Sequence, residues 1–134
     1  MPHIEFDGLT ADELLALSAS DFDELVLRDE PVLFRSGSAD VLGRFSLVDS
    51  TLIIELAHID GGGEGVLPAI ASLASRVAAQ RGLSELEWRV HAVNCARPNP
   101  KLRRVLERRG FVIRTIEDVG EVFFQRQEVR SLVR

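Results

Sequence analysis

The sequence predicts a single α/β domain of the α+β type: a mixed, mostly antiparallel twisted sheet flanked by helices on both faces. Two observations carry this prediction. Three extended segments follow one another with only short turns between them, which is typical of an antiparallel meander. A glycine cluster then joins the last segment to a long helix and another strand, which makes those two strands parallel if they are neighbours. With 134 residues, the chain has the length of one domain, 1–134.

The meander consists of Pro31 to Arg35, Val41 to Val48 and Leu52 to Ile59. Turn-forming residues separate the three segments, at 36–40 and at Asp49-Ser50. The third segment is the most apolar, so we expect it in the centre of the sheet, where both faces are covered.

The helix and strand of the crossover come next along the chain. Apolar residues recur at spacings of three and four from Leu67 to Ala78 and predict a long helix that ends at Gly82. The alternating segment Leu86 to Val93 predicts the strand after it. A basic helix then begins at Pro98-Asn-Pro100 and ends at Gly110.

Both ends of the chain add further elements. The pattern Thr10-Ala-Asp-Glu13 is a capping box and predicts a helix over about 11–18, and Ser20 begins a second helix. Phe111 to Thr115 and Glu121 to Gln127 predict a closing hairpin.

Composition excludes several classes of protein. A single cysteine, Cys95, cannot form an intrachain disulfide, which suits a reducing, cytoplasmic compartment. The first residues lack the basic and apolar regions of a secretory signal. The longest nearly apolar stretch, Leu52 to Ile59, falls far short of the ~20 residues of a membrane span. We therefore expect a cytoplasmic protein with no membrane partner.

Charge is distributed unevenly along the chain. The net charge is −5, but residues 1–65 hold 14 acidic and 3 basic residues, whereas residues 66–134 hold 7 acidic and 13 basic residues. Much of the positive charge lies between Arg97 and Arg114 and would attract a phosphorylated small molecule, an acidic partner or nucleic acid. Because the whole chain is acidic, nucleic acid is the weakest of these three, and we expect no nucleic-acid partner.

The glycine cluster at 61–65 stands between a strand and the start of a helix. Backbone N–H groups of such a loop, together with the helix N-terminus, suit a phosphate or pyrophosphate. A flexible turn is the alternative reading, because Asp60 and Glu64 both repel phosphate.

Two spaced motifs resemble those of the GNAT acetyltransferase superfamily. Asp60-x-x-Gly63-x-Gly65 stands where that family has its Gln/Arg-x-x-Gly-x-Gly/Ala loop for the pyrophosphate of acetyl-CoA. The segment from Asn99 to Gly110-Phe111 is similar to the family's Asn-x(10)-Gly-Phe segment, which packs a helix near the pantetheine arm. The resemblance covers roughly residues 30–127 and extends to the order of the elements.

The resemblance implies an N-acetyltransferase that uses acetyl-CoA as cosubstrate and acetylates a primary amine of a small molecule or a peptide, and at family level it implies a homodimer. The acidic N-terminal helices favour a cationic acceptor such as a polyamine. The alternative is a catalytically inactive GNAT-fold binding or sensor module, so the sequence leaves open whether the chain is an enzyme. The residues that the resemblance places at the cofactor are Leu56, Ala57, His58, Gly61, Gly62, Gly63, Glu64, Gly65, Val66, Asn99, Leu102 and Arg104.

Two departures from the family pattern bear on activity. Asp60 occupies the first loop position, where the family prefers Gln or Arg, and it offers the diphosphate neither a donor nor a positive charge. Leu106 occupies the position where the family often carries a tyrosine that protonates the leaving thiolate, and the chain contains no tyrosine.

Acetyl transfer to an amine needs a base and a donor for the developing oxyanion. Glu55 is the first candidate base, because a carboxylate inside an apolar strand has a raised pKa unless it is paired, and Arg89 is one such partner. His58 is the second candidate, although strand alternation puts it on the opposite face from Glu55. In this family the oxyanion donor is usually a backbone N–H, here around 56–58.

The remaining histidine and cysteine are weaker candidates. His91 shares the polar face of its strand with Glu87 and Arg89 and is expected to be structural. Cys95 could protonate the thiolate, but a small buried residue is the commoner outcome. His58, His91 and Cys95 lack a compact ligand spacing, so no metal site is expected.

Overall fold

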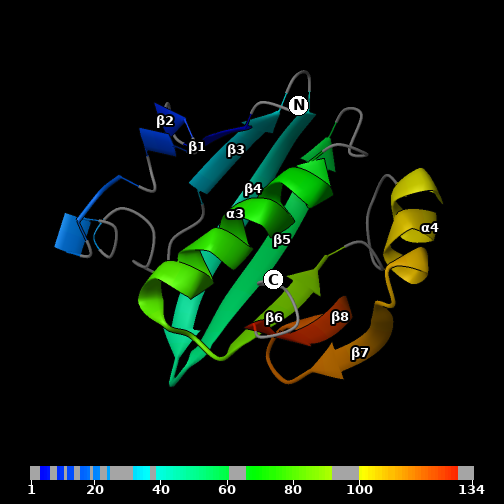
Figure 1. Cartoon of the computed structure of the whole chain (residues 1–134). Coiled ribbons are helices and arrows are strands. Elements are labelled where there is room, and N and C mark those ends of the chain that lie inside the picture. Colours follow the sequence, from blue (N-terminus) through cyan, green and yellow to red (C-terminus); the bar gives the residue numbers. More distant parts are fainter. Residues whose placement is uncertain are drawn as a thin grey trace.

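A computed structural model describes residues 4–6, 9–10, 12–13, 16–18, 20–21, 24, 32–36, 39–60, 66–91 and 100–129. These residues form an eight-stranded sheet with the order β2-β1-β3-β4-β5-β6-β8-β7 (Figure 1). The strands are β1 Ile4–Phe6, β2 Leu9–Thr10, β3 Val32–Ser36, β4 Ala39–Val48, β5 Thr51–Asp60, β6 Glu85–Val90, β7 Val112–Ile116 and β8 Gly120–Glu128. The longer helices are α3 Val66–Arg81 and α4 Pro100–Arg108.

The predicted α+β class with a mixed, mostly antiparallel sheet is confirmed. Both long helices, α3 and α4, contribute to the core on one face, so helices on both faces are not seen among the described residues. β5 and β6 pair in parallel through the crossover that carries α3, and every other neighbouring pair of described strands is antiparallel. β5 lies inside the sheet, as its apolar sequence predicts. β6 is shorter than the predicted strand. It ends at Val90, His91 follows outside any strand, and residues 92–93 lie outside the described residues.

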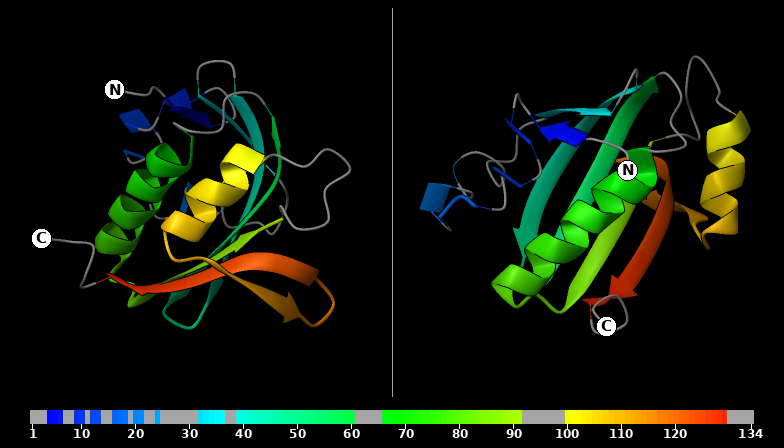
Figure 2. Two further views of the ribbon diagram at one scale, coloured as in Figure 1. Left: turned by 90° about the vertical axis from the view of Figure 1, so that its right-hand side faces the viewer. Right: turned by 45° about the horizontal axis from the view of Figure 1, so that its top comes forward.

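The core lies between the sheet and the two long helices. Leu52, Ile54 and Leu56 alternate along β5 toward α3, and all three are fully buried. Trp88 and Val90 extend the same face on β6. Figure 1 and Figure 2 show α3 running along this face, which we call the helix face, while α4 stands apart from α3, near β7 and β8. The two short helices expected before residue 25 fall largely outside the described residues.

The opposite face, which we call the polar face, carries the other residues of the same strands. Ile53 and Glu55 point to it from β5, and Glu87 and Arg89 point to it from β6. It therefore presents ionisable side chains where the helix face presents a hydrophobic core.

Part of the N-terminal prediction is confirmed. Thr10 N–H donates to Glu13 Oε1 and Glu13 N–H donates to Thr10 Oγ1, both at 3.2 Å, which is the reciprocal pattern of a capping box. The short strands β1 and β2 were not predicted, because strands of two or three residues are too short to show alternation.

No helix within the described ranges is long and apolar enough to cross a membrane.

Candidate functional site

The parallel strands β5 and β6 part at a defined point. Their register runs from Thr51↔Glu85 to Leu56↔Val90, and the His91 N–H then donates to the Leu56 carbonyl at 2.8 Å. β5 continues to Asp60, four residues beyond that point, while its other edge stays paired with β4. The glycine cluster follows the end of β5 and lies outside the described residues.

The part of β5 beyond β6 offers backbone groups on one edge. Beyond Leu56, the pairing of β5 with β4 shifts by one residue between Leu42↔Ala57 and Asp40↔Asp60, so β5 carries an extra residue at 58–59 and its regular alternation is interrupted past the end of β6. A backbone N–H in this position can pair with an extended ligand or with a developing negative charge. The side chain of His58 lies outside the described part of the structure.

Glu55 and His91 meet at the same point on the polar face. His91 Nε2 lies 2.7 Å from Glu55 Oε2, and the two side chains are 30% and 23% exposed. A carboxylate oxygen accepts hydrogen bonds, so in this pair the imidazole is the donor, through Nε2–H. The sequence nominated Glu55 as the base and expected a structural role for His91. The structure brings the two together.

Arg89 lies opposite Glu55 in the strand register, but its side chain binds Glu87 instead. Its guanidinium donates to Glu87 Oε2, with Nε 2.8 Å away, and Arg126 of β8 donates to Glu87 Oε1. Burial by itself would raise the pKa of Glu87, but the hydrogen bonds and positive charges of Arg126 and Arg89 outweigh it, so the pKa is lowered. Because Glu87 holds Arg89, the carboxylate of Glu55 is left to His91.

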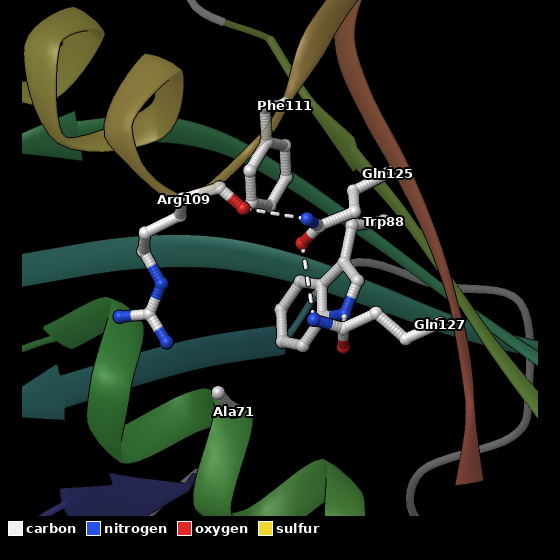
Figure 3. A pocket seen from close by; sticks show the side chains of 6 residues that line it. All are labelled: Ala71, Trp88, Arg109, Phe111, Gln125 and Gln127. Atoms are coloured by element: carbon white, nitrogen blue, oxygen red, sulfur yellow. Dashed lines mark hydrogen bonds between the residues drawn. The ribbon is translucent and has the colours of Figure 1, made fainter. Parts of the chain in front are cut away.

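A small pocket lies on the helix face, on the other side of the sheet from Glu55 and His91, and is lined by Ala71, Trp88, Arg109, Phe111, Gln125 and Gln127 (Figure 3). A chain of hydrogen bonds runs along it. The Trp88 indole N–H donates to Gln127, the Gln127 amide donates to Gln125, each at 3.1 Å, and the Gln125 amide donates to the Arg109 carbonyl at 2.6 Å. This chain ties β6 and β8 to the C-terminal end of α4. These hydrogen bonds were not predicted from the sequence, although Gln125 and Gln127 at alternate positions of an apolar strand were a usable signal.

The other residues predicted to contact the cofactor are distributed as follows. Leu56 is fully buried and Ala57 is half-buried on β5. On α4, Leu102 is 6% exposed within the core and Arg104 is exposed. Outside the described residues lie Gly61, Gly62, Gly63, Glu64, Gly65 and Asn99, and also Cys95 and the side chain of Val66.

No group of three or more potential metal-ligating side chains occurs in the part of the chain that the structure describes.

Comparison with known proteins gives structural neighbours only. No family model matches the sequence, and no curated protein matches it. Nourseothricin acetyltransferase is 20% identical with a TM-score of 0.45, over 74% of this chain and 64% of that one. The PaiA N-acetyltransferase from Thermoplasma acidophilum, solved with coenzyme A, is 11% identical with a TM-score of 0.46, over 93% of this chain and 98% of that one.

The described elements have the topology that the resemblance to the GNAT superfamily predicts: a meander, a parallel pair joined through α3, and a closing hairpin whose last strand inserts beside β6. In this fold the parting strands, the Glu55–His91 pair and the N-terminal end of α3 gather at one end of the sheet.

Proposed function

We propose that this protein is an acetyl-CoA-dependent N-acetyltransferase that acts on a primary amine of a small molecule or a peptide. The observation that carries the proposal is the Glu55–His91 pair, which lies on the polar face where β5 and β6 part. The two spaced motifs of the sequence support the same cosubstrate.

The exposed edge of β5 suits the arm of this cosubstrate. Pantetheine is an extended chain with two amides, and it would take the place that β6 leaves next to residues 57–60. The N-terminal end of α3 and the exposed Arg104 of α4 are the groups that would meet its phosphates. The bound thioester supplies the acyl group.

The protein's own groups would then act in a simple sequence. Glu55 accepts a proton from the ammonium group of the acceptor, so that the neutral amine can attack the acyl carbon. His91 orients the Glu55 carboxylate through its Nε2–H. The backbone N–H of His58 stabilises the negative charge that develops on the acyl oxygen. The new amide bond replaces the thioester bond, and coenzyme A leaves as a thiolate that takes a proton from water.

One observation favours the alternative of a non-catalytic binding module. Leu106, at the position of the family's tyrosine, is fully buried in the core, so no side chain there can protonate the thiolate. A thiolate is a good leaving group at neutral pH, so this absence lowers the expected rate without preventing the reaction.

Calorimetric titration separates the two functions. The purified protein is titrated with acetyl-CoA, and with CoA and ATP as controls, and is then assayed for release of free thiol with a broad panel of amines. Micromolar binding of acetyl-CoA and turnover with at least one amine would support the enzyme. Binding of acetyl-CoA without turnover favours the module, and absence of binding at millimolar acetyl-CoA contradicts the proposal.

A further inference from the structure

Arg44 of β4 lies directly opposite Glu55 in the antiparallel register of β4 and β5. Residues that face each other in this way point to the same face of the sheet, with Cβ atoms about 5 Å apart. Arg44 is therefore a half-buried cation on the polar face, next to the carboxylate that we propose as the base.

Arg44 has no ion pair with any residue that the structure describes. Its nearest acidic neighbour across the strands, Glu55, is turned to His91. The other cations of the central polar face differ in this respect, because Arg89 and Arg126 both bind Glu87. A partly desolvated guanidinium without a counter-ion favours binding of an anion, and its planar donors match a carboxylate.

The acceptor must reach Glu55 from this same face. On the helix face, the equivalent positions are occupied by the buried side chains Ile54, Leu56 and Trp88, which pack against α3. Among the described residues, the half-exposed side chains where the strands part lie on the polar face. An acceptor whose amine meets Glu55 therefore places its neighbouring atoms beside Arg44.

We propose that Arg44 binds a carboxylate of the acceptor, so that the substrate class is a zwitterionic amine: a compound whose primary amine and carboxylate are only a few bonds apart, such as a free amino acid. The inference rests on the proposed acetyl transfer. It differs from the polyamine-like acceptor expected from the charge of the N-terminal segment, because Arg44 repels a second positive charge on the acceptor.

The test compares three acceptor series: L-amino acids, their carboxamides, and the corresponding amines without a carboxylate. We expect wild-type KM to be at least tenfold lower for the best amino acid than for its carboxamide. Arg44→Met keeps the aliphatic stem and removes the charge, and it should raise that KM at least tenfold while leaving the KM of the carboxamide unchanged. Arg44→Lys should recover part of the difference. The matched control is Arg76→Met on α3, whose only described partner is Asp12 at 3.7 Å, and it should change neither KM.

Binding is also measured without turnover, by the ¹⁵Nε–H signal of Arg44 and by saturation-transfer NMR with the same three series. Carboxylate-dependent binding that Arg44→Met abolishes would support the inference even if no acetyl transfer occurs, in which case only the proposed function fails. Acetyl transfer with the same KM for amino acids, carboxamides and simple amines would overturn the inference and leave the proposed function standing. If no amino acid binds and no amine is acetylated, both are wrong.

Discussion

Glu55 and His91 come from parallel strands and hydrogen-bond at 2.7 Å, although the residue opposite Glu55 in the register is Arg89. The pair exists because Glu87 binds the Arg89 guanidinium and because β6 ends at Val90, which lets His91 turn toward Glu55. A salt bridge predicted from strand neighbours alone would therefore have named the wrong partner.

Glu55→Gln should lower kcat for acetyl transfer by about 10²-fold or more, because a neutral amide cannot take the ammonium proton, while the affinity for acetyl-CoA stays unchanged. Stopped-flow detection of free thiol gives kcat, and calorimetry gives the affinity. The matched control is Glu121→Gln, an exposed carboxylate in β8, which should keep wild-type kcat. An active Glu55→Gln enzyme would remove Glu55 from the role of base.

His91→Ala should reduce kcat less than Glu55→Gln does, because His91 orients the base and does not accept the proton. The two substitutions should not be additive: in the double variant, the loss should stay close to that of Glu55→Gln alone. A complete double-mutant cycle of kcat values measures this coupling. Fully additive losses would show that His91 acts independently of Glu55.

Because of Glu87, the free energy of unfolding should decrease as the pH falls in the acid range. The pKa of this buried carboxyl is lowered from its ordinary value of 4.5, so its contribution is complete above that value and is lost as pH falls through the lower, folded-state pKa. Glu87→Gln should destabilise the fold by about 2 kcal/mol at pH 7, because it leaves Arg89 and Arg126 without their shared carboxylate.

Urea unfolding of both proteins between pH 7 and pH 3 measures this dependence. The free-energy difference between wild type and Glu87→Gln should shrink toward the acid end of the range. A difference that is independent of pH would mean that the carboxylate charge contributes nothing at this position.

Gly43 makes room for the core side chain of Phe34. A Cβ at position 43 would lie 2.6 Å from Phe34 Cε2 and 3.3 Å from Leu56 Cδ2, so Gly43→Ala should destabilise the fold by about 1–3 kcal/mol through overpacking. Thermal and urea unfolding give the value. In Phe34→Leu/Gly43→Ala the smaller side chain leaves space for the methyl group, so the double variant should cost less than the sum of the single ones. Simple additivity would contradict the clash.

Gln125→Glu tests the hydrogen-bond chain on the helix face. The variant keeps an acceptor for Gln127, but it loses the amide that donates to the Arg109 carbonyl and places a negative charge at the C-terminal end of α4. We expect a loss of about 1–2 kcal/mol and faster amide hydrogen exchange in the last turn of α4. Unchanged exchange at residues 105–109 would show that α4 is held by its core contacts alone.

Local patterns in the sequence were sufficient for much of the fold. The alternation of Leu52, Ile54 and Leu56 predicted a central strand, and the spacing of apolar residues from Leu67 to Ala78 predicted α3. The capping box at Thr10 and Glu13 was also predicted, because it joins residues three positions apart. Glu55 could be nominated as the base because a carboxylate is rare in an apolar strand.

The pairing of side chains depended on the tertiary structure. Glu55 and His91 are 36 positions apart, and Trp88 and Gln127 are 39 positions apart, so no local pattern connects them. Strand order and register decide which arginines bind Glu87 and which one stays beside Glu55. Order and register are in turn set by the packing of the whole sheet against α3 and α4. The sequence by itself determined the helices and strands and the candidate base, Glu55. Only the assembled sheet determined that His91 is the partner of Glu55 and that Arg44 lies beside it, because those contacts form only when distant strands become neighbours.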